Sequence, residues 1–513
     1  MRYKKKNISN IKARHVFITE LDARYDTILY LISISRKLRR ASNVLTGIMQ
    51  KKLKALLRDK TYRETLELYR KEEDEKQKKE IGKELFKIGE KHNVSWEFCR
   101  KKMIEIQKRL GIKSIFALTK AEDIWCGVEK CLFSNGKELH FFKYGDLSSI
   151  RAKQTTRGIV LYTENDVLAI EVDKKKLDLI LKDRFQADEH DAIVKYLNNK
   201  SDDFRPCFCT IVPKLIRGKY RLYLHITVEG KACSKYDKEG NIKHHYGKGV
   251  VGIDIGTQSI AYTSETEVNL KNLSERGSNI TKNEKRERRL LRAMDRSKRA
   301  TNPNNYKKDG TIKKGPKKWI FSKRYKKLRE KFRDLCRKGA INRKLAINED
   351  VNYIRSLGDV LITEPKNASK LMKRAKKTTK NDKGKFKKKK RFGKSIKNRC
   401  PGKFQSSLEQ KFKVSNGTYI EVPKEYRASQ YDHTVDDYIK KKLSQRIYKL
   451  KDGTTVQRDW YSSFLLYCYN MKTETIDKIR CKQEFDRQLE KEQRLIEQIK
   501  DKKVKIFNSG IKI

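Results

Sequence analysis

The spacing of hydrophobic residues predicts a helical region in the first quarter of the chain. Between residues 21 and 135, apolar side chains such as Leu31, Ile34 and Leu38 recur every three or four positions, which places them on one face of an α-helix. Charged runs such as KEEDEKQKKE (71–80) lie between the apolar positions and are typical of a solvated helix face. Residues 1–20, which precede this region, have room for one short strand.

After residue 135 the hydrophobic period changes to two, which predicts β-structure. Leu222, Leu224, Ile226 and Val228 alternate with other residues and therefore share one face of a strand. The tripeptide Arg217-Gly218-Lys219 separates two such runs and is typical of a hairpin turn. We expect one helix, from about 174 to 185, to interrupt the strands. The region 136–246 as a whole predicts a basic β-barrel or a small sheet.

A third pattern begins near residue 249 and alternates strands with helices. VVGIDIGTQSIAYTS (250–264) reads as two strands joined by a glycine turn, and DVLITEP (359–365) reads as a buried strand closed by proline. Helical periodicity is predicted over four stretches, namely 285–306, 322–347, a segment that starts at about 457, and 472–502. This alternation predicts an α/β domain, and with the preceding regions a multidomain α+β protein.

The charge of the chain narrows the classes of partner. The 513 residues include 125 Lys and Arg against 65 Asp and Glu, a formal net charge of +60. A chain of this length is expected to form about two to four domains. Such an excess of positive charge repels itself unless a polyanion neutralises it, and its spread along the chain indicates a long bound nucleic acid.

The sequence shows neither a membrane-spanning segment nor an export signal. No stretch of eighteen residues is apolar, and the basic start MRYKKKNISN is not followed by a hydrophobic segment. The ten cysteines contain no C-x-x-C pair, so a zinc site of the usual spacing has no ligands. We therefore expect a protein of the bacterial cytoplasm with reduced thiols, no membrane contact and no zinc.

Two basic segments are the best candidates for contact with phosphates. Residues 370–399 hold sixteen Lys or Arg and one acid, Asp382, which is too much charge to bury. The second segment repeats basic residues on a predicted helix with few interleaved acids, which favours phosphate contacts over a merely solvated face. Its candidate contacts are Arg286, Arg288, Arg289, Arg292, Arg296, Lys298 and Arg299.

Three acids stand out because each adjoins an apolar run. Asp254 lies inside VVGIDIG, Glu364 ends VLITE, and Asp459 opens an apolar helix. Each alone is more often a turn or helix-cap carboxylate. Together, in this order on a highly basic chain, they match an RNase H-like nuclease. There a first acid lies mid-sheet, a second ends a later strand, and a third begins a neighbouring helix. Converging carboxylates repel one another unless divalent cations offset the charge, so we expect Mg²⁺ or Mn²⁺, as two ions.

The first motif also fits another class of enzyme. GIDIGTQSIAY (252–262) is similar to the phosphate-binding hairpin of actin-like and sugar-kinase ATPases. That fold needs a second glycine-rich phosphate loop, and the nearest candidate, 451–455, lacks paired glycines. The charge also suits such an enzyme poorly, so the nuclease interpretation is favoured.

Several segments together resemble a known family. They are GIDIGTQSIAY, LRAMDRSKRATNPNNY with the following KKW and SKRY, KRAKKT with KKRFGKSI, RASQYDH, KKKLSQR and VQRDWYSSFLL, and they span roughly 249–470. In this order they resemble TnpB, the transposon-encoded RNA-guided nuclease with a RuvC-like site that is related to type V CRISPR effectors. The N-terminal half resembles the family only in layout.

The resemblance implies an architecture. Residues 1–20 and 136–246 would form a wedge-like β-barrel, and 21–135 a helical recognition lobe. Residues 247–513 would form the RuvC-like nuclease domain, with a basic helical insertion at about 275–347. Many relatives carry a zinc ribbon before the last acid; the corresponding hairpin here, at about 429–456, has no cysteines.

The resemblance also implies a function and further contacts. The catalytic and metal-binding residues would be Asp254, Glu364 and Asp459. A guide RNA would pair with double-stranded target DNA, a short flanking motif would be read by the protein, and one site would cut the displaced strand and the target strand. Further nucleic-acid contacts would come from Lys373, Arg374, Lys376, Lys377, Lys387, Lys388, Arg391, Lys394, Ser429, Gln430 and Arg458.

Two rival functions share these features. A nuclease-inactive, RNA-guided DNA binder or repressor would be expected to have lost acids, whereas all three are present here. A transposase with an RNase H-like site would act on transposon ends without a guide. The guide RNA, the flanking motif, the cut positions, the oligomeric state and a transposon-borne or CRISPR-associated origin stay open.

Overall fold

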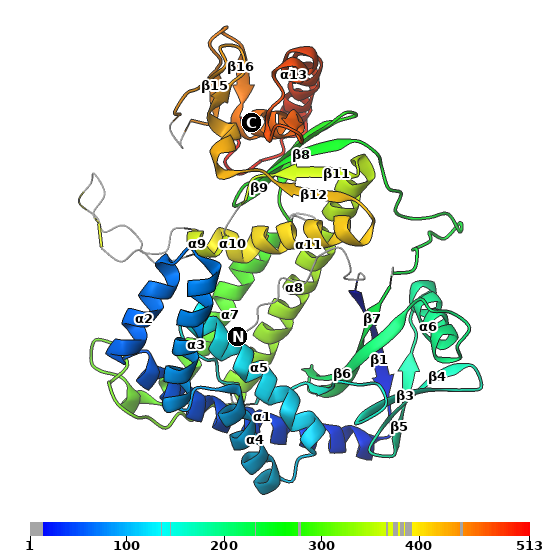
Figure 1. The fold of residues 1–513 in the computed structure, drawn as a ribbon, viewed down its shortest axis with the longest axis vertical. Helices are drawn as coiled ribbons and strands as arrows, with labels where there is room; N and C mark the ends of the chain where they lie inside the picture. The colour runs from blue at the N-terminus through cyan, green and yellow to red at the C-terminus, as the bar shows by residue number, and fades with distance from the viewer. Residues whose placement is uncertain are drawn as a thin grey trace. The chain divides into compact units, whose positions relative to one another are not determined.

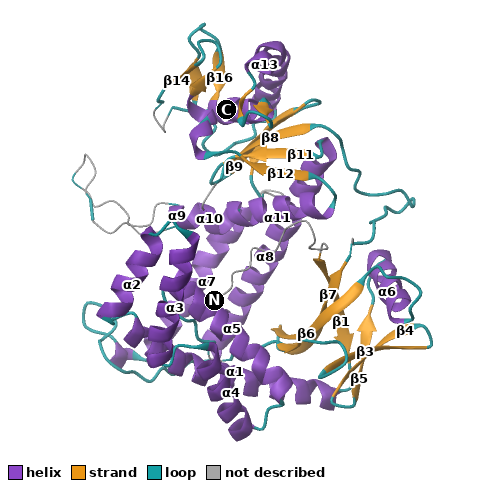
Figure 2. Ribbon diagram, in the orientation of Figure 1, coloured by secondary structure: helices purple, strands orange, loops and turns teal. Residues whose placement is uncertain are grey.

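The computed structural model describes most of the chain, as two compact units. The described residues are 14–134, 136–143, 145–230, 232–274, 279–365, 368–372, 378–379, 384, 392–441 and 445–512. The units are Met1–Tyr236 and Asp237–Ile513, each a mixture of helices and strands (Figures 1 and 2). None of the described helices is both long and apolar enough to cross a membrane.

Five helices form the helical part of the first unit, as the periodicity predicts. Side chains cap three of them: Asp59 accepts the N–H of Tyr62, Asp74 that of Lys76, and Ser95 that of Phe98. Gly111 adopts the left-handed conformation that ends the fourth helix. Leu45 and Met103 lie in their shared hydrophobic core. The helices are α1 (Tyr25–Leu56), α2 (Lys60–Lys71), α3 (Glu75–Lys91), α4 (Trp96–Leu110) and α5 (Ser114–Phe133).

A seven-stranded sheet completes the first unit. Its strand order is β2-β6-β7-β1-β5-β4-β3, so the first strand of the chain lies between β7 and β5. The four alternating residues from Leu222 to Val228 are buried, which confirms that they share a face. The strands are β1 (Arg14–Asp22), β2 (Ile150–Ala152), β3 (Ile159–Glu164), β4 (Val167–Val172), β5 (Lys175–Ile180), β6 (Arg205–Ile216) and β7 (Lys219–Glu229).

The prediction of a helix at about 174–185 is wrong. Residues Lys175–Ile180 form β5, which pairs with both β1 and β4. The helix of this region, α6 (Arg184–Leu197), begins later because Asp183 caps it by accepting the N–H of Gln186 at 2.9 Å. Leu177 and Leu179 alternate with exposed residues, which is the period of a strand and not of a helix, and backbone pairing on both edges fixes that strand.

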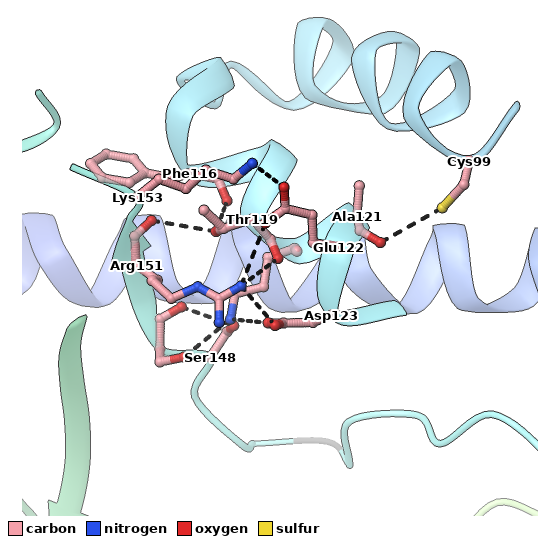
Figure 3. A network of polar contacts seen from close by, with 11 residues as sticks. Cys99, Phe116, Thr119, Ala121, Glu122, Asp123, Ser148, Arg151 and Lys153 are labelled. Atoms are coloured by element: carbon pink, nitrogen blue, oxygen red, sulfur yellow. Dashed lines mark hydrogen bonds and ion pairs between the residues drawn. The ribbon is translucent and has the colours of Figure 1, made fainter. Parts of the chain in front are cut away.

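A polar cluster fastens α5 to the edge strand β2 (Figure 3). The Arg151 guanidinium contacts Asp123 at 2.9 Å and donates to the carbonyl of Thr119 at 3.2 Å. Lys120 is buried and contacts Asp123 at 3.2 Å; burial lowers the pKa of its amine. Lys153 pairs with Glu122 in the same cluster. The helices and sheet of the first unit are thus joined by ion pairs as well as by apolar packing.

The second unit is built on a five-stranded sheet of order β10-β9-β8-β11-β12. The first three strands are antiparallel neighbours, and β11 runs parallel to both β8 and β12. The central strand is therefore β8, which Figure 2 shows with β9 and β11 beside it. The strands are β8 (Val250–Ile255), β9 (Ser259–Ser264), β10 (Val268–Asn272), β11 (Val360–Thr363) and β12 (Thr418–Glu421).

The helices of the second unit follow the predicted order with shifted ends. One predicted for 322–347 continues to Leu357, because Val351 and Ile354 pack into the core beside the sheet. The last begins at Lys478, after Thr475–Ile476 has paired as a strand with Tyr469–Asn470. The helices are α7 (Asn279–Thr301), α8 (Lys323–Leu357), α9 (Ala368–Leu371), α10 (Gly393–Arg399), α11 (Pro401–Val414), α12 (Arg458–Tyr467) and α13 (Lys478–Asp501).

Three short hairpins connect the elements after β12. They are β13 (Tyr431–Asp432) with β14 (Asp437–Tyr438), β15 (Ile447–Lys449) with β16 (Thr455–Gln457), and β17 (Tyr469–Asn470) with β18 (Thr475–Ile476). The first two lie in the region, at about 429–456, for which one hairpin is predicted.

A buried arginine ties the segments that enter and leave the sheet. The Arg355 guanidinium donates to the carbonyls of Gly247, Gly358 and Ser415 at 2.9, 3.0 and 3.1 Å, and to the Ser415 hydroxyl at 2.7 Å. Its charge lies 4.6 Å from the centre of the Tyr246 ring. Because each of these carbonyls needs a donor when buried, Arg355 fixes the ends of α8 and α11 against the chain that leads into β8.

Helix α12 lies directly on the central strand at Gly252. A Cβ on this glycine would come within 2.2 Å of the backbone nitrogen of Tyr467 and 2.3 Å of the carbonyl oxygen of Ser463. On the neighbouring strand, Thr263 pairs with Gly252, and its hydroxyl bonds that of Ser463 at 2.8 Å. The position therefore requires glycine, because no side chain fits between the strand and the helix.

We predict that Gly252→Ala strongly destabilises the second unit. The new methyl would meet backbone atoms that cannot move aside, so we expect a loss of about 3 kcal/mol or more in the free energy of unfolding. Chemical denaturation of the purified protein measures this loss. Gly82→Ala is the control, since its Cβ would only reach the Tyr69 ring at 3.5 Å and alanine favours a helix. Equal stability of the two variants would contradict the close packing.

Candidate functional site

Asp254 lies in the central strand and is nearly buried, with 9% of its surface exposed. Because side chains alternate along a strand, it points to the same face as Gly252, two residues earlier. That is the face on which α12 lies. The first predicted acid is thus located between the sheet and the helix that carries the third.

Glu364 follows the parallel strand next to Asp254. The register pairs Thr363 with Ile253, and the Thr363 hydroxyl donates to the Ile253 carbonyl at 3.1 Å. The next residues along the two strands are Glu364 and Asp254. Pro365 comes directly after the acid, and Glu364 is half-buried. The parallel pairing therefore brings the first two acids to the same level of the sheet.

Asp459 lies in the first turn of α12. It is four residues before Ser463 and so shares the helix face that contacts the sheet. Its carboxylate is 3.5 Å from the Arg446 guanidinium, and its side chain is 13% exposed. Gln457 caps the helix by accepting the N–H of Trp460 at 2.7 Å. The third acid is thereby held at the end of α12 that carries the positive helix dipole.

The three acids belong to neighbouring elements, and their donor chemistry suits a hard divalent cation. Carboxylate oxygens are the ligands that Mg²⁺ and Mn²⁺ prefer. In the present side-chain positions, however, the described residues contain no group of three or more His, Cys, Asp or Glu side chains that could hold a metal ion. Asp459 instead contacts Arg446. The three carboxylates are suitable ligands for such an ion, and Asp459 would give up its contact with Arg446 in order to bind the metal.

The predicted phosphate contacts on α7 are mostly exposed. Of the seven basic residues from Arg286 to Arg299, all but Lys298 are exposed. Lys298 is half-buried and lies 3.6 Å from the centre of the Trp319 ring. Arg299 bonds Asp295 at 2.8 Å and the carbonyl of Gly310 at 2.9 Å. The exposed arginines can reach a polyanion, whereas Lys298 and Arg299 also stabilise the loop after α7.

The remaining predicted contacts are described only in part. Ser429 and Gln430 lie in a half-buried turn, Arg458 begins α12, and Lys394 belongs to α10. The others lie outside the described residues, namely Lys373, Arg374, Lys376, Lys377, Lys387, Lys388 and Arg391.

Polar and aromatic contacts join the two hairpins in the region 429–456. Asp432 is buried and accepts the N–H of Lys451 at 3.1 Å, which links the first hairpin to the turn of the second. The Tyr461 hydroxyl lies 2.7 Å from Nδ1 of His433 and accepts the backbone N–H of the same residue at 3.1 Å. Burial lowers the pKa of His433. These bonds tie both hairpins to α12.

Sequence reasoning missed three residues around Asp459. Arg446, Gln457 and Glu492 are ordinary polar residues in the sequence, and glutamine is not among the usual N-cap residues. Glu492 is 2% exposed, accepts the backbone N–H of Gln457, and has an Oε1 without a hydrogen-bond partner in the described part of the chain. Burial raises its pKa to about 7. Only the fold reveals that α13 brings this carboxyl to the start of α12.

We predict that Glu492→Gln stabilises the protein at high pH. A carboxyl whose pKa is raised from about 4.5 to about 7 stabilises the fold fully below pH 4.5, and this contribution is lost as the pH rises through 7. The neutral amide avoids the loss, which is worth roughly 3 kcal/mol. Thermal denaturation should show a higher Tm for the variant at pH 8 and little difference near pH 5. A lower Tm at pH 8 would contradict the buried acid.

Comparisons with known proteins find similar solved structures but no matching family model or curated sequence. The chain is similar in structure to the protein in a cryo-EM structure of the Cas12f1-sgRNA-target DNA complex, with a TM-score of 0.46 and 14% sequence identity. The match covers 86% of this chain and 83% of that chain.

Proposed function

We propose that this protein is an RNA-guided DNA endonuclease of the TnpB type, whose single nuclease site is RNase H-like and lies in the second unit. The observation that carries the proposal is the position of three acids on neighbouring elements. Asp254 lies mid-sheet, Glu364 follows the adjacent parallel strand, and Asp459 begins the helix that covers Asp254. This is the layout expected of an RNase H-like nuclease.

The charge of the protein supports a nucleic acid as the partner. A net charge of +60 favours binding to a long polyanion over a small substrate. The exposed arginines of α7 carry part of this charge within the same unit as the acids. We propose that a guide RNA and a double-stranded DNA target with a displaced strand neutralise it, in a bacterial cytoplasm.

The three acids would hold the metal ions in this proposal. When bound, a pair of Mg²⁺ or Mn²⁺ ions would activate the attacking water and stabilise the leaving 3′ oxygen. The chain supplies carboxylate oxygens from three elements, and the burial of Asp254 limits its movement. Retention of all three acids favours an active nuclease over a nuclease-inactive binder.

We predict that Asp254→Asn stops DNA cleavage and preserves nucleic-acid binding. The substitution keeps the shape of the side chain and removes one charged oxygen, so we expect at least a hundredfold lower cleavage rate, on the order of a lost metal contact. Cleavage and filter-binding assays measure the two properties, and wild-type cleavage should stop in EDTA. Asp452→Asn is the control, because Asp452 is exposed in the turn between β15 and β16. Undiminished cleavage by the Asp254 variant would refute the site.

We also predict that the guide sequence of the bound RNA determines which DNA sequence is cut. The RNA that copurifies with the protein is sequenced, and the protein is then reconstituted with RNAs whose guide segment is changed. Cleavage should move to each new matching sequence while the flanking motif is kept, since base pairing and not the protein reads the target. Cleavage that stays at one DNA sequence whatever RNA is supplied would favour the transposase instead.

A further inference from the structure

The segment Val504–Ile511, called here the strap, follows α13 and is fixed at one end to the sheet. Asn272 of β10 donates to the carbonyl of Lys505 at 2.8 Å and accepts the N–H of Phe507 at 2.9 Å. Ile506 is buried in a cluster that includes Ala261 and Leu270. Two hydrogen bonds and an apolar anchor therefore hold the strap against β10 and β9.

The other end of the strap reaches the start of α12. The Ser509 carbonyl accepts the side-chain N–H of Gln457 at 3.1 Å, and both residues are buried. Gly510 has a φ of +80°, and a Cβ there would lie 2.6 Å from the Cβ of Arg446. The strap therefore contacts the residue that caps α12, and it packs against the residue that pairs with Asp459.

These two contacts fall on residues that adjoin the third acid. Gln457 uses both ends of its amide, because Oε1 accepts from Trp460 and Nε2 donates to Ser509. Arg446 also fixes the helix start through its backbone, since its carbonyl accepts the N–H of Arg458 at 2.9 Å. A shift of the strap would move the cap, the arginine and the first turn of α12 together.

We propose that the strap is a positioning element for Asp459, with Gln457 and Gly510 as its positioning residues. The proposal rests on the proposed function, because it assigns the strap to the geometry of the same site. A metal-dependent site tolerates only about half an ångström of displacement in its ligands. A helix terminus frays unless its first amides are bonded, so the strap supplies rigidity that the short α12 lacks.

Gly510→Ala tests the strap, with Gly453→Ala as its matched control. Both glycines have a positive φ, +80° and +92°, but a Cβ on Gly453 would meet nothing within 4 Å. Both substitutions therefore strain the backbone, and only the first also pushes the strap from Arg446. Each purified full-length variant is compared with the wild-type protein in three measurements. These are amide hydrogen exchange over residues 456–463, the Mg²⁺ concentration that half-saturates cleavage, and the Kd for guide RNA.

We expect Gly510→Ala to exchange these amides at least tenfold faster and to need at least fivefold more Mg²⁺. Its Kd for guide RNA should stay within twofold of the wild-type value, and Gly453→Ala should match the wild type throughout. Exchange and Mg²⁺ dependence equal to those of Gly453→Ala would overturn the proposal. So would a loss of RNA binding as large as the loss of cleavage, since that indicates a general structural role.

Gln457→Ser gives an independent answer if Gly510→Ala fails to fold. Serine keeps a capping oxygen but lacks the amide that donates to Ser509. Faster exchange in residues 456–463 and a higher Mg²⁺ requirement would support the strap, and wild-type values would refute it. If the wild-type protein cleaves no DNA with any RNA supplied, the proposed function fails. The exchange measurement then still decides whether the strap holds the start of α12.

Discussion

The close approach of α12 to β8 at Gly252 is the constraint on which the candidate site depends. With no side chain at this position, the helix backbone lies on the strand backbone, and the hydroxyls of Thr263 and Ser463 meet across the contact. Asp254 is two residues along the strand from this point, and Asp459 is one turn along the helix from Ser463. A wider separation would move the acids apart, whatever the side chains themselves prefer.

Polar groups inside the second unit specify this arrangement more than apolar packing does. Arg355 satisfies three carbonyls that would otherwise be buried without donors, and Gln457 is bonded at both ends. Hydrophobic contacts tolerate sliding, whereas a buried donor has few acceptors in reach. Glu492 shows that such polar groups can lower the stability of the fold, because its burial disfavours the charged carboxylate. Buried polar groups therefore fix the chain that leads into β8 and the start of α12 at some expense in stability.

The sequence predicts the elements that have a strong local signal. Alternation identified the buried face of β7, and the apolar runs around Asp254, Glu364 and Asp459 located two strands and a helix. Local signals were misread at β5, where Leu177 and Leu179 alternate as in a strand and the strand has neighbours on both edges. They also could not reveal Gln457, Arg446 or Glu492, because the partners of these residues come from distant parts of the chain. The predicted domain limits and nucleic-acid contacts remain predictions.

The position of α12 in the sequence has a consequence for the newly made chain. Gly252 and the exposed arginines of α7 leave the ribosome early, whereas α12 is synthesised about two hundred residues after β8. At 5–20 residues per second, this delay is roughly ten to forty seconds. During that interval the face of β8 that α12 will cover lacks its partner, and the strap is made later still. A nascent chain thus presents its basic helix well before it has the third acid of the candidate site.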